Sequence, residues 1–213
     1  MSSSARKTKI NAKQYAAELV ALIDGAASVP MAVDYFLTQR NVSLKDMLDR
    51  VMPKVASLLI LRHGFEEAYA VLTQGLLEDP CNPYLLTVRG KLQWKQGDVA
   101  GAQATYESLP THIPARNSLA RLLLELGQTH RARALYEETL AMTNDTNVVA
   151  LNGLAKLLIA EGSDEARARA QLLLESSLEL KWQDNDASDI AKAADLTLNA
   201  PAEAHSGPQL RLV

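Results

Sequence analysis

Cysteine is almost absent from this sequence: Cys81 stands alone among 213 residues. A single cysteine cannot form an internal disulfide, so we expect a chain that works in a reducing compartment. Phenylalanine and tryptophan are also scarce, with two residues of each, while hydrophobic residues still make up 47% of the chain. Leu and Ala supply most of that apolar content. Their small and branched side chains favour close-packed helices over a sheet.

The sequence also lacks strong charge and long apolar runs. Its net charge of −3 does not by itself imply a nucleic-acid or membrane partner. The N-terminus is basic, but the apolar stretch that follows is broken by Glu18, so we expect neither a signal peptide nor a membrane span. We therefore expect a cytoplasmic protein whose basic tail is solvated. The basic residues at this end are Arg6, Lys7, Lys9 and Lys13.

Residue patterns that carry chemistry are missing as well. The four histidines, His63, His112, His130 and His205, have no metal-ligand spacing between them or with Cys81. No glycine-rich loop follows a strand, and no Ser, His and acid set suggests a nucleophile. We therefore expect no catalytic residue, no metal and no cofactor, and we interpret the chain as a non-enzyme.

What the sequence does contain is a recurring order of turn, small residue and aromatic or Leu. A turn glycine is followed by an alanine and then by Leu72, Tyr106 or Tyr136. In the first turn, His63 takes the position held elsewhere by glycine. Small residues at these points would let two helices approach closely, and the larger side chain would fill the gap to the next pair. The turns are His63-Gly64, Gly97, Gly127 and Gly162, and the small residues are Ala68, Ala102, Ala132, Gly90, Ala120 and Ala155.

A period of about 34 residues with two helices per unit resembles the tetratricopeptide-repeat family over about residues 49–181. The resemblance implies an all-α fold, a right-handed superhelical array of antiparallel helix pairs with capping helices at both ends. The expected repeats are 49–82, 83–112, 113–147 and 148–181. The second repeat departs from the family pattern, because it is short and has Arg89 where a Leu is expected.

The segments outside the repeats are expected to cover the ends of the array. Residues 11–48 form an N-terminal helical cap, with Asn11 and Ser43 as helix N-caps and Pro53 beginning or kinking the next helix. Residues 182–199 form a C-terminal capping helix. Residues 1–10 and 200–213 are expected to be disordered.

The resemblance also implies a concave groove lined by the first helix of each repeat. In the family, the fifth and ninth positions of that helix point into the groove. Asn can pair with the backbone of an extended peptide, and Lys and Arg add charge-assisted hydrogen bonds to carboxylates. The alternative is that the cations are merely solvated and that the Asn side chains bond nearby backbone groups. The predicted groove residues are Thr87, Asn117 and Asn152 at the fifth position, Lys91, Arg121 and Lys156 at the ninth, and Tyr84 and Lys95 on the same wall.

The sequence thus favours a non-enzymatic protein-interaction module, an adaptor, assembly factor or chaperone-like protein. It would bind an acidic or extended segment of another protein in its concave groove. The alternative is a scaffold that self-associates into a larger complex, and a homo-oligomer is compatible with either. We expect no membrane partner, and a nucleic-acid partner is disfavoured.

Overall fold

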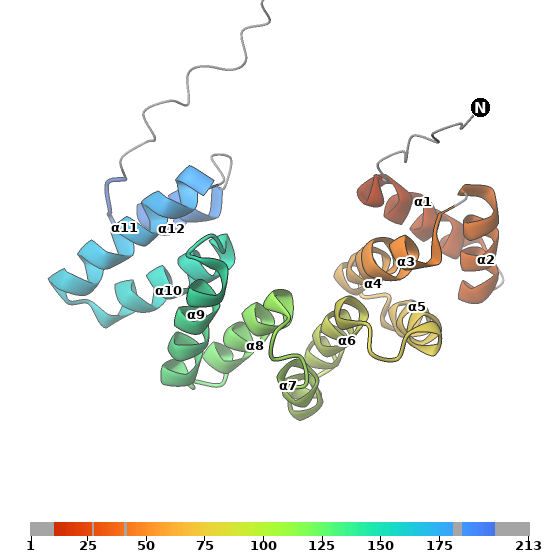
Figure 1. Cartoon of the computed structure of the whole chain (residues 1–213), viewed down its shortest axis with the longest axis horizontal. Coiled ribbons are helices and arrows are strands. Elements are labelled where there is room, and N and C mark those ends of the chain that lie inside the picture. The colour runs from red at the N-terminus through yellow and green to blue at the C-terminus, as the bar shows by residue number, and fades with distance from the viewer. Residues whose placement is uncertain (1–10, 27, 41, 181–184, 199–213) are drawn as a thin grey trace, which may run out of the picture. The chain divides into compact units, whose positions relative to one another are not determined.

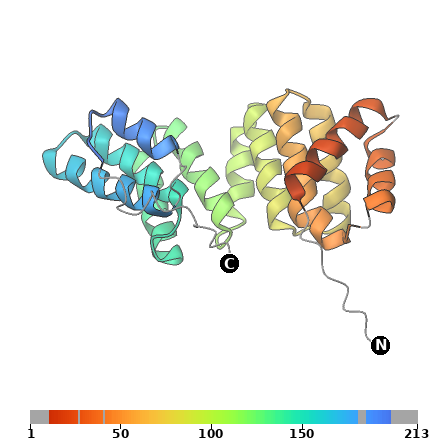
Figure 2. The ribbon, with the colours of Figure 1, turned by 90° about the horizontal axis from the view of Figure 1, so that it is seen from above.

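The structure is a computed structural model that describes residues 11–26, 28–40, 42–180 and 185–198. It consists of two compact units, Met1–Ala115 and Arg116–Val213, called the N-terminal and C-terminal units below. Figures 1 and 2 show that each unit is built from helices, and no strand occurs in the described ranges. The predicted all-α class is confirmed. The expected tails, 1–10 and 200–213, lie outside the described residues.

In the N-terminal unit the helices pack as neighbouring pairs. The pairs α4 with α5 and α6 with α7 are joined through contacts of α5 with α6, and α1 lies across α4. One continuous core contains Leu19, Phe36, Val55, Leu72 and Leu85, each at most 2% exposed. The elements are α1 (Ala12–Gly25), α2 (Val29–Arg40), α3 (Leu44–Asp46), the π-helix η1 (Met47–Val51), α4 (Met52–Leu61), α5 (Phe65–Glu78), α6 (Pro83–Lys95) and α7 (Val99–Glu107).

The C-terminal unit is built in the same way. Helix α10 packs against α9 and α11, and α12 covers α10 and α11. Helix α12 lies within the range 182–199 that was expected to form a capping helix, and residues 182–184 and 199 of that range lie outside the described residues. The elements are α8 (Ile113–Glu125), whose first turn belongs to the other unit, α9 (Thr129–Thr143), α10 (Val148–Glu161), α11 (Asp164–Leu180) and α12 (Asn185–Ala193).

The turn inside each helix pair contains one residue in the left-handed conformation. Gly97, Gly127 and Gly162 have φ of 88°, 71° and 80°. His63 has φ of 60°, so it takes the same conformation despite its side chain. The prediction that His63 replaces a turn glycine is confirmed, and the substitution places an L-residue where glycine is favoured.

The predicted small residues are buried between packed helices. A Cβ on Gly90 would lie 2.6 Å from the Tyr106 ring. Gly153, which the sequence pattern did not single out, lies against the Tyr136 ring in the same way. Arg89, the departure from the family pattern, is exposed, whereas Gly90 beside it is buried. The arginine therefore disturbs no core contact. Ala68, Ala102, Ala120, Ala132 and Ala155 are all fully buried, as expected.

The two helix N-caps predicted in the first 48 residues, Asn11 and Ser43, are present in the structure. The Asn11 side chain accepts a hydrogen bond from the Gln14 backbone N–H at 3.2 Å, and Ser43 caps α3. Helix α3 continues through η1 into α4, where Pro53 is the second residue. Proline lacks the backbone N–H that an α-helix needs, and the π-helical turn directly before it accommodates this defect.

Candidate binding cavity in the N-terminal unit

The predicted groove residues on α6 have different environments. Tyr84 and Thr87 line one cavity, described below, and the Thr87 hydroxyl donates within the helix to the Pro83 carbonyl at 2.7 Å. Lys91 is half-buried. Lys95 is exposed, with its Nζ 5.8 Å from the Trp94 ring centroid.

The predicted residues of the C-terminal unit do not share one environment either. Asn117 and Asn152 are each only 7% exposed. The Asn117 amide donates to Oδ1 of Asn147 at 3.2 Å, and the same oxygen caps α10 by accepting from the Ala150 N–H at 2.8 Å. Asn117 therefore holds α8 to the start of α10 through a side chain 30 residues away, and not through the nearby backbone groups that the alternative interpretation names.

The two predicted cations of that unit, Arg121 and Lys156, are exposed. Lys156 lines a cavity of about 390 Å³ between α10 and α12. Asp186 and Asp189 line the same cavity, so both signs of charge meet there. An anionic ligand would gain little at such a site, because nearby carboxylates repel it.

The cavity that contains Tyr84 and Thr87 lies wholly within the N-terminal unit and has a volume of about 620 Å³. It is bounded by the start of α1, by η1 and α4, by α6, and by His112 and Pro114 at the start of α8. Three of its residues are large apolar side chains with high exposure: Leu58 at 37%, Leu61 at 68% and Tyr84 at 43%. Pockets that bind ligands are typically apolar with a few placed polar groups. The remaining lining residues are Ala12, Lys13, Ala16, Asp49, Arg50, Pro53, Lys54, Ser57, Thr87, Val88, His112 and Pro114.

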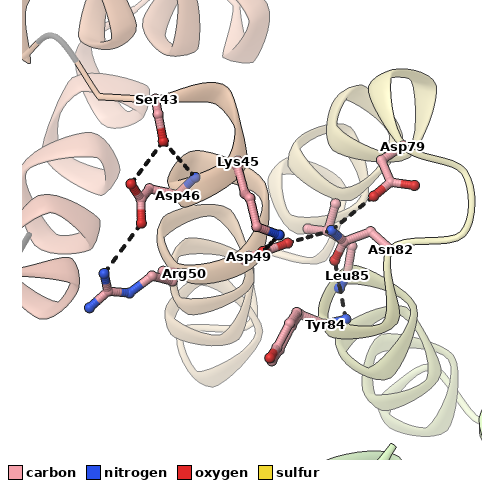
Figure 3. Close-up of polar contacts among 9 residues, drawn as sticks. All are labelled: Ser43, Lys45, Asp46, Asp49, Arg50, Asp79, Asn82, Tyr84 and Leu85. Atoms are coloured by element: carbon pink, nitrogen blue, oxygen red, sulfur yellow. Dashed lines mark hydrogen bonds and ion pairs between the residues drawn. The ribbon is translucent and has the colours of Figure 1, made fainter.

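One wall of the cavity is fixed by Asn82, the N-cap of α6 (Figure 3). Its Oδ1 accepts from the backbone N–H groups of Tyr84 and Leu85, both at 3.1 Å. Its Nδ2 donates to Asp49 at 2.8 Å and to Asp79 at 3.2 Å. Asn82 is only 2% exposed. This one amide therefore caps α6, ties it to η1, and sets the position of Tyr84 on the rim.

The Asp49 carboxylate is fully engaged in this network. One oxygen accepts from Asn82, and the other lies 2.6 Å from Lys45 Nζ. Partial burial alone would raise the pKa of Asp49, but the bonds from Lys45 and Asn82 outweigh it and hold that pKa below its usual value. The negative charge on the cavity wall is thus compensated within the protein.

Two lysines that line the cavity form no ion pair in the described part of the chain. Lys13 and Lys54 line it, are exposed, and pair with no acid among the described residues. Arg50 differs, since it forms an ion pair with Asp46 at 3.3 Å. With Asp49 compensated, the cavity presents a net positive field to a ligand.

His112 closes the cavity beside Tyr84. The two rings meet edge to face, with centroids 4.8 Å apart and planes at 88°. Burial lowers the pKa of His112, so the imidazole is neutral at pH 7. Its buried Nε2 has no hydrogen-bond partner in the described part of the chain. The neutral ring therefore contributes no positive charge to the cavity.

The sequence did not predict several residues of this cavity. Leu58 to Leu61 are four consecutive apolar residues, and one face of a helix cannot bury all of them. That run is the signal that could have indicated an exposed apolar site. Lys54 and His112 carry no comparable signal, because they reach the cavity only through the packing of distant segments.

The chain matches no known protein-family model and no curated protein. Within the described ranges, no helix has the length and apolar character needed to cross a membrane. The same residues contain no group of three or more His, Cys, Asp and Glu side chains arranged to hold a metal ion.

Proposed function

We propose that this chain is a non-enzymatic protein-binding module of the tetratricopeptide-like, right-handed solenoid type. Its ligand is an acidic segment of another protein that carries a bulky apolar side chain. The proposal rests on one observation: the apolar cavity of the N-terminal unit is rimmed by the uncommitted cations Lys13 and Lys54. The repeated left-handed turns and buried small residues support the repeat class.

The two parts of the cavity would contribute differently. Burying one large apolar side chain of the ligand against Leu58, Leu61 and Tyr84 stabilises a complex by about 1.5–3 kcal/mol. An exposed pair with Lys13 or Lys54 contributes only about 0–1 kcal/mol. The apolar anchor therefore carries affinity, while the lysines select acidic ligands and speed their association.

The test uses synthetic peptides with one central Leu or Phe, flanked by Asp and Glu in one series and by Lys in the other. We expect the acidic series to bind the full chain in fluorescence anisotropy, with affinity that falls as salt rises. Leu61→Gln and Lys54→Glu should each weaken binding by roughly 10-fold. Leu172→Gln is the matched control, since Leu172 lies on α11 and is also highly exposed, at 64% against 68% for Leu61.

Equal affinity for the acidic and basic series would refute the charge argument. Equal affinity of the wild type and Leu61→Gln would refute the cavity as the site. Light scattering on the same samples tests the scaffold alternative, which requires a concentration-dependent oligomer. An oligomer that Leu61→Gln disrupts would reassign the cavity to self-association.

A further inference from the structure

Helix α4 gives the cavity of the N-terminal unit two chemically different ends. Lys54, Ser57, Leu58 and Leu61 all line the cavity, and they follow one another at i, i+3, i+4 and i+7. This spacing places the four side chains along one face of α4. The face begins with an exposed cation and ends with two exposed leucines.

The distance between the two ends follows from helix geometry. Lys54 and Leu61 both belong to α4, Met52–Leu61. At a rise of about 1.5 Å per residue, their Cα atoms lie about 10 Å apart along the helix axis. Helical side chains lean toward the N-terminus of their helix, and the lysine side chain is the longer of the two. This lean adds to the separation between the ammonium group and Leu61.

The second lysine lies at the same end of the cavity as Lys54. The ends of α1 and α4 meet at the ion pair between Asp24 and Arg62, which measures 3.1 Å. Helix α1 also contacts η1, the turn directly before α4. Lys13, near the start of α1, therefore lies toward η1 and away from Leu61. On α4 itself, no lining residue after Lys54 carries a charge.

We propose that the cavity selects its ligand by spacing: it binds an extended segment in which an acid stands four residues from a bulky apolar side chain. This inference rests on the proposed function and specifies its ligand. Side chains of an extended chain at even separations point to the same side, and each residue adds about 3.3 Å. Two residues span about 7 Å, which is too short for the two ends of the cavity. Four residues span about 13 Å, so the acid reaches Lys54 while the apolar side chain contacts Leu61.

A helical ligand fits this wall less well. Amphipathic helices bind through apolar anchors at i, i+3, i+4 and i+7, which need an apolar surface over about two turns. The lining face of α4 is apolar only over its last turn, because Lys54 and Ser57 occupy the turn before it. A helical ligand would also need about seven residues to cover the same distance.

The test uses peptides of about 12 residues that contain one Phe and one Glu in a background of Ser and Thr. Glu stands two, three, four, six or seven residues from Phe, and each spacing is made with Glu before Phe and with Glu after it. A peptide with Gln in place of Glu serves as the uncharged reference. Dissociation constants are measured by NMR titration of the full chain, which also quantifies weak binding, and helix formation is followed by circular dichroism.

We expect the peptide with a spacing of four to bind tightest, roughly 3- to 5-fold more tightly than those with two, three or six, because only it forms the exposed ion pair. Lys54→Gln should remove this advantage and leave the other peptides unchanged. Leu61→Gln should weaken every spacing. Lys156→Gln is the matched control, since Lys156 is an exposed lysine of the other unit, and it should bind as the wild type does.

Several results would overturn the inference. Equal affinity at all spacings, with every Glu peptide still tighter than the Gln reference, refutes selection by spacing and leaves the proposed function standing. Tightest binding at seven, with helix formation on binding, identifies a helical ligand instead. An advantage at four that survives Lys54→Gln assigns it to another group. If no Glu peptide binds more tightly than the Gln reference, the proposed function fails and this inference fails with it.

Discussion

Replacement of Asn82 by alanine removes a side-chain amide that caps α6 and also bonds Asp49 of η1. The loss of the N-cap, with its two 3.1 Å bonds to Tyr84 and Leu85, costs about 1 kcal/mol. A hydrogen bond to a charged group is worth about 1.5–3 kcal/mol. The 2.8 Å bond to Asp49 belongs near the lower limit, because Asp49 still has its ion pair with Lys45 in the variant. We therefore expect Asn82→Ala to lower the free energy of unfolding by about 2–3 kcal/mol.

At about 4 °C for each kcal/mol, this loss lowers the melting temperature of the N-terminal unit by about 10 °C. Trp94 lies in this unit and is the only tryptophan left in a Trp182→Phe background. Its fluorescence therefore follows the unfolding of the N-terminal unit. Urea titration followed at Trp94 gives the free energy of unfolding. Circular dichroism shows whether the other unit stays helical.

Two matched variants separate the roles of Asn82. Asn11→Ala removes a single cap bond of 3.2 Å at an exposed position, so it should cost only about 0.5 kcal/mol. Asn82→Asp keeps the cap acceptor but places a carboxylate beside Asp49 and Asp79, so it should destabilise through repulsion. A loss of unfolding free energy for Asn82→Ala no larger than that for Asn11→Ala would contradict this expectation, as would an unchanged unfolding free energy for Asn82→Asp.

Two further predictions concern histidines. His63→Gly should raise the free energy of unfolding by about 0.5–1 kcal/mol, because glycine accepts the φ of 60° without strain; a loss of stability in urea titration would contradict this. Burial lowers the pKa of His112, so the unfolded chain takes up its proton at higher pH than the folded chain. The stability of the N-terminal unit should therefore fall as pH drops below about 6.5, toward the lowered pKa. Trp94-detected melting between pH 7 and 5.5 should show a smaller decrease for His112→Gln than for the wild type, and identical slopes would contradict the account.

Much of the fold could be predicted because its determinants are local. Left-handed turns at Gly97, Gly127 and Gly162 require a residue that tolerates positive φ, and the sequence places one at each turn. The cap at Asn11 and the buried alanines likewise depend on a few neighbouring residues. These features repeat along the chain, so each supports the interpretation of the others.

The candidate site was harder to predict, because its residues meet only through packing. Asp49 and Asn82 come from different helix pairs, and Lys13 reaches the cavity because α1 lies across α4. The resemblance to the tetratricopeptide-repeat family implies that Asn117 and Asn152 are groove residues. It cannot show that both are buried, nor that Asn117 bonds Asn147 at the start of the next helix pair.

If the positive apolar cavity in the N-terminal unit selects an acidic ligand, reversal of the cavity's charge should reverse that selection. The double variant Lys13→Glu with Lys54→Glu should bind the acidic peptides roughly 100-fold more weakly and the Lys-flanked peptides more tightly than the wild type does. Its circular dichroism spectrum should stay unchanged. If the double variant still prefers acidic peptides as the wild type does, the charge of the cavity does not determine which peptides bind, and the proposed selection of an acidic ligand is wrong.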